Sequence, residues 1–143
     1  LIKLKIFISS DHAGFYLKNK IIHNFNKTKY KIINLGPYND NAVDYPIFAK
    51  KVAKKVAKNK SYFGILVCGS GTGMAMAANK VKNIRAAMCY NVKNTKLSRL
   101  HNNANIITVG SRLTSKNLAI KLINIFLKTK FEGGRHMRRI KNI

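Results

Sequence analysis

The stretch CGSGTGMAMAANK, residues 68–80, joins a cysteine to three glycines at alternate positions and then to a helix-like run. Such a loop exposes backbone amides at the start of a helix, where anions bind. The same amides favour the thiolate form of Cys68, which stands at the mouth of the loop. A thiolate there suits nucleophilic attack, or removal of a proton next to a carbonyl group while the amides stabilise the enediolate. A buried structural role is the alternative, and it suits the second cysteine, Cys89, better.

Two familiar nucleotide-binding motifs do not match this loop. A dinucleotide fingerprint requires Gly-x-Gly-x-x-Gly and an acidic residue about 20 positions further on. Here Met74 stands where the last glycine should be, and no carboxylate occurs between Asp44 and Glu132. A P-loop requires Gly-Lys-Ser or Gly-Lys-Thr, which the sequence lacks. A thiol oxidoreductase is also disfavoured, because there is no Cys-x-x-Cys.

Strands and helices are predicted to alternate along the chain, which is typical of a parallel sheet with helices on both faces. Ser10 or Asp11 is expected to cap the first helix, and residues 131–143 are expected to be irregular. No linker, low-complexity block or internal repeat is present, so residues 1–143 are interpreted as one domain. The predicted strands are 3–9, 29–36, 62–69, 84–90 and 105–111, and the predicted helices are 15–25, 47–58, 92–101, 115–130 and one that starts at 73.

Three stretches with chemically useful residues directly follow predicted strands. SSDHAG spans residues 9–14, CGSGTG spans 68–73, and GSR spans 110–112. Ligands of open parallel sheets bind at the carboxyl ends of the strands, so these stretches are predicted to meet at one edge. The sequence therefore predicts a candidate site at that edge.

The composition is strongly basic, with 28 Lys and Arg residues, only 4 Asp and Glu residues and a formal net charge of +24. Weak, salt-sensitive association with polyanions is expected from this charge alone. The lysines are nevertheless spread along the chain among many Asn and Ile residues, a trio that an AT-rich coding sequence favours. One helical face carries Lys50, Lys51, Lys54, Lys55 and Lys58, which indicates a solvated face. We predict no specific nucleic-acid partner, and a nucleic-acid-binding protein remains the alternative from another class.

Cysteine content and hydropathy bear on location. No apolar run approaches the length that spans a bilayer. The opening LIKLKIFIS contains lysines and leads into a turn, so it predicts a strand and not a signal peptide. Two cysteines are too few for a disulfide framework and suit a reducing compartment. We therefore expect a cytoplasmic protein without a membrane partner.

Seven motifs follow one another along the whole chain: SDHAG (10–14), VDYP (43–46), CGSGTGMAMAANK (68–80), IRAA (84–87), SRLHNNANI (98–106), GSR (110–112) and FEGGRHMRR (131–139). In this order they resemble the B-type ribose-5-phosphate isomerases, members of a sugar-phosphate isomerase family that includes the galactose-6-phosphate isomerase subunits. The resemblance implies reversible conversion of ribose 5-phosphate into ribulose 5-phosphate, in the non-oxidative pentose phosphate pathway, without a metal ion or organic cofactor. It also implies a Rossmann-like α/β/α sandwich with five strands, which forms a homodimer, or a dimer of two dimers, with active sites built from both subunits.

The resemblance also implies roles for individual residues. Cys68 aligns with the base that moves a proton between the first two carbons of the sugar, and Met74 replaces the glutamate that another branch of the family uses. His101 aligns with the acid that opens the furanose ring, and Ser70 supplies a hydroxyl expected in the catalytic turn. Tyr45 and Asp44 either line the site or cap the lysine-faced helix. Arg112, Arg135 and Arg139 align with the phosphate clamp. The implied substrate-binding positions are Asp11, His12, Gly69, Ser70, Gly71, Thr72, Gly73, Asn102, Arg112, Arg135, His136 and Arg139.

Two expectations remain, namely the identity of the sugar phosphate and the role of the C-terminal tail. An isomerase of allose 6-phosphate or galactose 6-phosphate is the alternative, although the pair His101-Asn102 and the Gly-Gly-Arg-His tail favour ribose phosphate. Arg135 and Arg139 are four positions apart, so one helical turn would place both on one face. The tail has little apolar material of its own, and we therefore predict that it reaches the dimer partner and clamps the phosphate there.

Overall fold

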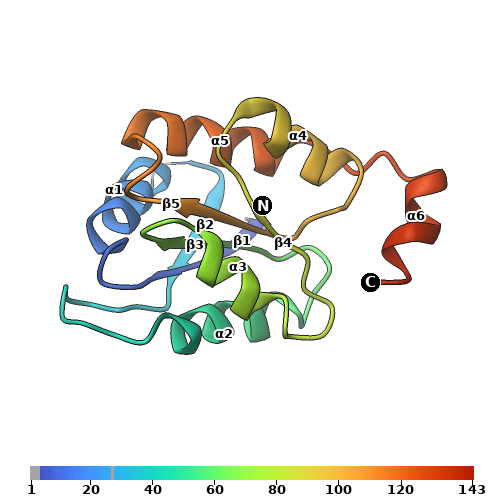
Figure 1. The fold of residues 1–143 in the computed structure, drawn as a ribbon. Helices are drawn as coiled ribbons and strands as arrows, with labels where there is room; N and C mark the ends of the chain where they lie inside the picture. Colours follow the sequence, from blue (N-terminus) through green and yellow to red (C-terminus); the bar gives the residue numbers. More distant parts are fainter. Residues whose placement is uncertain (1–3, 27) are drawn as a thin grey trace.

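The computed structural model describes residues 4–26 and 28–143, which form one parallel sheet with helices on both faces (Figure 1). The strand order is β2-β1-β3-β5-β4, and every neighbouring pair is parallel. The predicted five-stranded Rossmann-like sandwich is thus confirmed, although Lys3, the first residue of the predicted first strand, lies outside the described residues. The strands are β1 (Leu4–Ser10), β2 (Tyr30–Asn34), β3 (Phe63–Cys68), β4 (Ala86–Met88) and β5 (Ile106–Gly110).

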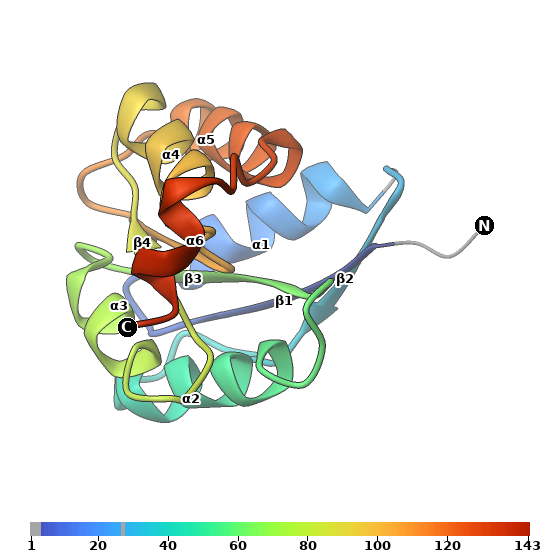
Figure 2. The same ribbon diagram turned by 90° about the vertical axis from the view of Figure 1, so that its right-hand side faces the viewer.

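Two layers of helices bury the central strands. Figure 2 shows α1, α4 and α5 on one face of the sheet, and α2 and α3 on the other. All residues of β5 and all but the first of β3 are buried, as a central strand of a parallel sheet requires. The helices are α1 (Phe15–Phe25), α2 (Tyr45–Val56), α3 (Thr72–Ala78), α4 (Val92–Leu100), α5 (Lys116–Lys128) and α6 (Arg135–Ile140).

The charge pattern of α2 agrees with the prediction. Its lysines are exposed, whereas Ala49, Val52, Ala53 and Val56 are buried against the sheet. These lysines therefore form a solvated face over an apolar stripe. Within the described ranges, no helix is long and apolar enough to cross a membrane.

Two local predictions are wrong. The helix α1 begins only at Phe15 with Gly14 as its N-cap residue, so neither Ser10 nor Asp11 caps it. The Asp11 Oδ1 atom instead accepts a hydrogen bond of 2.8 Å from the Gly14 N–H, which closes the turn before the helix. The segment 131–143 is not wholly irregular, because its six residues Arg135–Ile140 form α6 after Gly133 and Gly134, both of which have positive φ.

Candidate active site

The carboxyl ends of β1, β3 and β5 meet at one edge of the sheet, as predicted. The Asp11 N–H donates to the Val67 carbonyl at 3.1 Å, so the SDHAG turn is tied to the end of β3. The Ser111 N–H donates to the Cys68 carbonyl at 2.8 Å, and the Ser111 hydroxyl donates to the Ala13 carbonyl at 2.9 Å. Ser111 thus links the three predicted stretches, a role that its place inside the GSR motif could have suggested.

The loop after β3 holds the Cys68 thiol among backbone amides. The Sγ atom accepts a hydrogen bond of 3.0 Å from the Gly71 N–H, and the residue is 5% exposed. Gly71 has φ +80°, and a Cβ built there would lie 3.1 Å from the Val109 carbonyl carbon, so glycine is required on two grounds. The Thr108 hydroxyl on β5 also holds the loop, because it donates a hydrogen bond of 2.7 Å to the Gly71 carbonyl. The thiol is therefore positioned by the strand and by the loop together.

Two large side chains pack against glycines of this loop. A Cβ at Gly73 would lie 2.6 Å from the Tyr45 ring, and a Cβ at Gly69 would lie 3.0 Å from the Arg112 guanidinium. Tyr45, the first residue of α2, therefore packs against this loop, and its contact with the substrate stays a prediction. Ser70 and Thr72 are exposed at the same loop, where the Ser70 hydroxyl accepts a bond of 3.2 Å from the Thr72 N–H. A phenol ring and a guanidinium thus both lie against the loop that follows Cys68.

The SDHAG turn supplies an acid and a histidine to the same edge. Gly14 is required here, because a Cβ would lie 2.4 Å from the Val67 carbonyl oxygen. His12 is exposed, and its Nδ1 atom accepts a bond of 3.3 Å from the Val43 N–H, which joins the turn to the segment before α2. Asp44 stands at the N-cap position of α2, but its side chain makes no capping hydrogen bond. Asp11 and His12 therefore lie with the predicted site.

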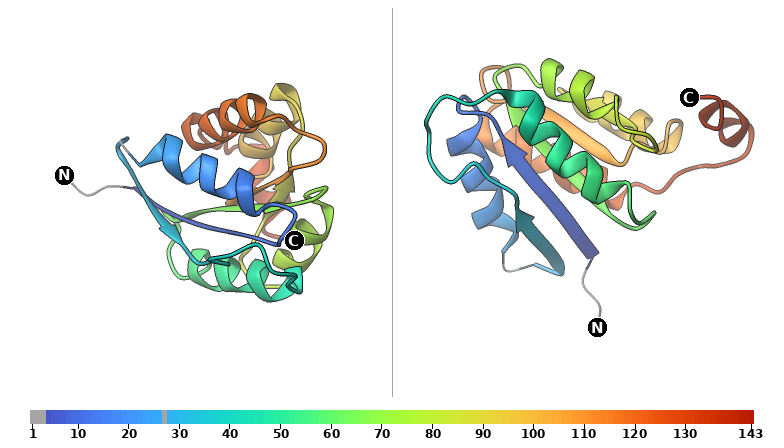
Figure 3. Two further views of the ribbon diagram at one scale, coloured as in Figure 1. Left: turned by 90° about the vertical axis from the view of Figure 1, so that its left-hand side faces the viewer. Right: turned by 90° about the horizontal axis from the view of Figure 1, so that it is seen from below.

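His101 and the tail lie elsewhere. His101 is the C-cap residue of α4, and this helix returns to the amino edge of the sheet, where β5 begins. β5 has five residues, so at 3.3 Å per residue its first and last Cα atoms are roughly 13 Å apart. Figures 1 and 3 show α6 and the end of α4 at the edge opposite to the loop after β3. A single chain therefore does not bring His101 and Cys68 together.

At the amino edge, the tail folds back onto the end of α4. The Glu132 N–H donates to the Leu100 carbonyl at 3.1 Å, and the His136 ring stacks on the His101 ring with centroids 4.3 Å apart and planes 14° apart. The His101 Nε2 atom lies 3.9 Å from Glu132 Oε2. Asn102 follows on the surface, and Arg135 and Arg139 are exposed on α6. The sequence suggested no role for Glu132, although its place in the FEGGRH motif was the available signal.

The electrostatics of this second cluster favour a neutral His136. Burial lowers the pKa of His136, and the neighbouring His101 and Arg135 lower it further. The Glu132 carboxylate raises the pKa of His136. Within the described part of the chain, the His136 Nε2 atom has no hydrogen-bond partner. Potential ligand atoms of His101, Glu132 and His136 all lie within 4.8 Å of one another, so these three residues could hold a metal ion.

Cys89 behaves as predicted for a structural cysteine. It is 1% exposed, and burial raises the pKa of its thiol. The Sγ atom lies 3.6 Å from the Ala87 carbonyl, in the hydrophobic core, and the side chains of Thr95 and Ser98 act on the thiol pKa in the opposite direction to burial. Cys68, by contrast, lies in the glycine loop at the carboxyl edge, where its Sγ accepts a hydrogen bond from a backbone amide.

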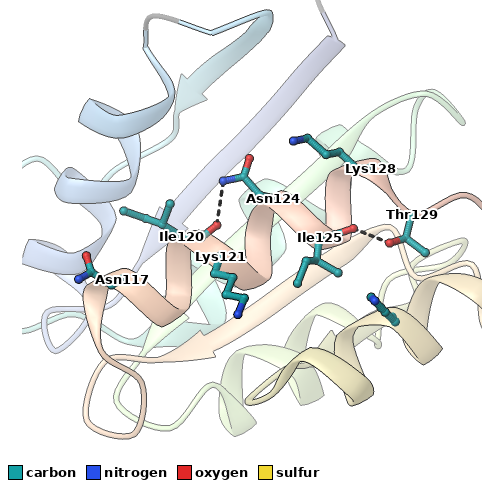
Figure 4. A pocket seen from close by; sticks show the side chains of 8 residues that line it. Asn117, Ile120, Lys121, Asn124, Ile125, Lys128 and Thr129 are labelled. Carbon is teal, nitrogen blue, oxygen red and sulfur yellow. Dashed lines mark hydrogen bonds between the residues drawn. The ribbon is translucent and has the colours of Figure 1, made fainter.

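A groove in the described part of the chain lies apart from both clusters. It has a volume of about 590 Å³ and lies between α4 and α5, as Figure 4 shows. Its walls carry amides, aliphatic groups and lysines but no nucleophile, histidine or acid, so we assign it no catalytic role. The lining residues are Lys96, Asn117, Ile120, Lys121, Asn124, Ile125, Lys128 and Thr129.

Comparisons with known proteins identify relatives over almost the whole chain. Residues 6–143 match the family model described as Ribose/Galactose Isomerase. A probable ribose-5-phosphate isomerase B from Mycoplasma genitalium is 50% identical over 141 residues, which cover 96% of this chain and 92% of that protein. The ribose-5-phosphate isomerase B of Escherichia coli is 38% identical over 139 residues, covering 97% and 93%. The crystal structure of ribose-5-phosphate isomerase B from Mycoplasma genitalium with bound ribulose-5-phosphate matches with a TM-score of 0.93 and 46% identity, covering 96% and 92%.

Proposed function

Because this chain belongs to the ribose/galactose isomerase family, we propose that it interconverts ribose 5-phosphate and ribulose 5-phosphate. The observation that carries the proposal is the Cys68 thiol, held at 3.0 Å from the Gly71 amide in a loop of bare amides. This arrangement suits a reaction in which a proton is removed beside a carbonyl group whose oxygen gains negative charge. The full-length similarity to named ribose-5-phosphate isomerases selects the sugar.

The loop supports proton transfer through an enediolate. Cys68, as the thiolate, takes the proton from C2 of the open-chain aldose, and the electron pair of that bond forms the C1–C2 double bond while the carbonyl oxygen O1 becomes negative. The amides of residues 69–73 stabilise that oxygen. Return of the proton to C1 and transfer of the hydroxyl proton from O2 to O1 leave the carbonyl at C2. Ser70 is exposed on the loop, and its hydroxyl is proposed to contact a sugar oxygen.

Other side chains at the carboxyl edge suit binding of the sugar. Tyr45 and Arg112 lie against the loop and offer a phenol and a guanidinium, and Asp11 and His12 lie in the adjoining turn. A polyol needs both donors and acceptors, which these groups supply. They are proposed to orient the open chain so that C1 and C2 face Cys68.

We propose that two copies of the chain complete each site. His101 is assigned to ring opening, Asn102 to substrate binding, and Arg135, His136 and Arg139 to the phosphate. All five belong to the amino edge. Because proton transfer and ring opening act on the same sugar, the amino edge of one subunit must approach the carboxyl edge of another. A homodimer in which the tail docks on the partner satisfies this requirement, and the α6 surface is polar enough to bind a phosphate there.

The substrate is tested with a panel of sugar phosphates. The purified protein is given ribose 5-phosphate, allose 6-phosphate and galactose 6-phosphate in parallel, and ketose formation is followed. We expect the highest kcat/KM with ribose 5-phosphate, and Cys68→Ala should abolish activity on every substrate that the site accepts. A preference for galactose 6-phosphate, or turnover of ribose 5-phosphate that survives Cys68→Ala, would contradict the proposal.

A further inference from the structure

Three side chains at the amino edge form a set of metal-type donors. His101 ends α4, Glu132 precedes α6, and His136 lies in its first turn. One potential ligand atom of each lies within 4.8 Å of the other two, and His101 Nε2 and Glu132 Oε2 are 3.9 Å apart. Two imidazole nitrogens and one carboxylate form a donor set that suits Zn²⁺ and open-coordinated zinc sites, whereas Mg²⁺ and Ca²⁺ prefer oxygen ligands.

The backbone between Glu132 and His136 turns through two glycines with positive φ. Gly133 and Gly134 have φ of +74° and +57°, and a Cβ built on either would meet no atom within 4 Å, so this turn faces open space. His136 is 6% exposed, and no described residue is hydrogen-bonded to its Nε2 atom. Coordination by this ring would therefore not compete with any hydrogen bond of Nε2. Glu132 is exposed and can swing toward the two rings.

We propose that His101, Glu132 and His136 form an inhibitory zinc site. Zn–N bonds of about 2.0–2.1 Å place tetrahedral ligands roughly 3.4 Å apart, so the donors must approach one another and the stacked rings must tilt. The fourth position stays open to water. An ion bound here occupies the His101 nitrogen and removes it from ring opening, a consequence that rests on the function proposed above. The positive charges of the nearby Arg135 and Arg139 repel a bound Zn²⁺ ion and weaken its binding. The site is therefore proposed to bind zinc reversibly and not as a structural ion.

Binding is tested without reference to catalysis. Zinc is titrated by calorimetry into the Cys68→Ser/Cys89→Ser protein, in which no thiolate competes. We expect one zinc ion per chain. Loss of a residue that only supports a metal ligand typically weakens metal binding roughly 10–100-fold. Because Glu132 is a proposed direct ligand, Glu132→Gln should weaken zinc binding by more than this. His136→Gln should have a similar effect. Asp40→Asn and His23→Gln are the matched controls, since they remove an exposed acid and an exposed histidine elsewhere on the surface. Absence of binding, or equal binding by Glu132→Gln, would overturn the proposal.

Inhibition is then measured on the protein with both cysteines intact. Zinc should slow conversion of ribose 5-phosphate, which requires ring opening, more than conversion of ribulose 5-phosphate, and EDTA should restore both rates. Glu132→Gln should raise the half-inhibitory zinc concentration at least about tenfold. Equal inhibition in both directions would place the inhibitory ion on Cys68 and overturn the proposal. A protein that binds zinc but isomerises neither sugar would instead refute the proposed function and leave the binding site standing.

Discussion

The two edges of the sheet each carry half of the proposed active site, but they are built differently. At the carboxyl edge, Cys68 is 5% exposed and is held by Gly71, while Ser111 and Thr108 bind the surrounding loops by hydrogen bonds. At the amino edge, Glu132, Arg135 and Arg139 are exposed, and the tail is attached through a backbone hydrogen bond and a stacked pair of rings. The carboxyl edge is preorganised within one chain, whereas the amino edge offers groups that a second molecule would have to cover.

The comparison predicts that the largest loss of activity comes from Cys68. Cys68→Ala removes the proposed base, which is typically worth about 10² to 10⁴-fold in rate. The substrate should still bind, because its phosphate is held by other groups. Steady-state kinetics measures the loss of rate, and a binding titration measures the retained affinity for the substrate. In a separate experiment, iodoacetamide should inactivate the wild type, and ribose 5-phosphate should protect it. Cys89→Ala is the control, and near-normal turnover by Cys68→Ala would remove the thiol from the mechanism.

Subunit mixing tests whether the edges of two chains form one site. A Cys68→Ala chain and a His101→Ala chain are each expected to be inactive, but a heterodimer of the two contains one site with both groups intact. Random mixing in a symmetric dimer should restore about a quarter of the wild-type sites. Activity after denaturation and refolding together provides the measurement.

Mixing Cys68→Ala with Arg112→Ala is the matched control for that experiment. Both changes lie at the carboxyl edge, so every site in the heterodimer would carry one defect, and activity should not rise above that of the Arg112→Ala component. Equal recovery from both mixtures, or none from the first, would contradict a site shared between the two edges.

His101 should affect the two reaction directions differently. Ribose 5-phosphate is mostly a furanose and needs an acid to open it, whereas ribulose 5-phosphate cannot close a five-membered ring. His101→Asn should therefore lose at least about tenfold more rate on ribose 5-phosphate than on ribulose 5-phosphate, within the range of general acid catalysis. Initial rates in both directions provide the measurement. Equal losses would argue against ring opening by this residue.

The sequence predicted the two edges unequally, for physical reasons. The order of strands and helices followed from hydrophobic patterns, and the SDHAG, CGSGTG and GSR stretches were correctly placed together because carboxyl ends of parallel strands share one edge. The helix α6 was missed because RHMRRI follows two glycines and has little periodicity to detect. The position of Glu132 beside His101 depends on the tail folding back to the Leu100 carbonyl, a long-range contact that no local pattern specifies.

The tail arginines should contribute less than the catalytic groups. Arg135→Lys and Arg139→Lys keep the charge but lose the paired hydrogen bonds that guanidinium makes with phosphate. Each change should raise KM by the equivalent of about 1.5–3 kcal/mol, the contribution of a charge-assisted hydrogen bond, with a smaller effect on kcat. Arg138→Lys, also exposed on α6, is the control. An unchanged KM in both variants would remove the tail from phosphate binding.

Each edge also contains one buried cation that holds its loops. Near the amino edge, Arg99 Nε donates to the Thr129 carbonyl at 2.9 Å, and burial lowers the pKa of Arg99 to about 10. Near the carboxyl edge, Lys18 is fully buried, and its Nζ donates to the Pro37 carbonyl at 2.8 Å and to Asn34 Oδ1 at 3.0 Å. The sequence could not show the burial of Lys18, because a lysine between Leu17 and Asn19 on an amphipathic helix is expected to reach solvent.

The smallest expected effect concerns the pH dependence of stability through Lys18. Burial lowers the pKa of Lys18 from 10.5 to about 8. Between those values the unfolded chain binds more protons than the folded chain, so this residue makes stability rise with pH across that window. Lys18→Met lacks the rise of unfolding free energy with pH that the Lys18 titration causes, and it also removes the hydrogen bond to the Pro37 carbonyl. Urea unfolding of both proteins at pH 7.5, 8.5 and 9.5 should show a wild-type advantage that grows with pH, while titrations common to both proteins cancel. An advantage that is constant across the three pH values would mean that Lys18 keeps its ordinary pKa in the folded chain.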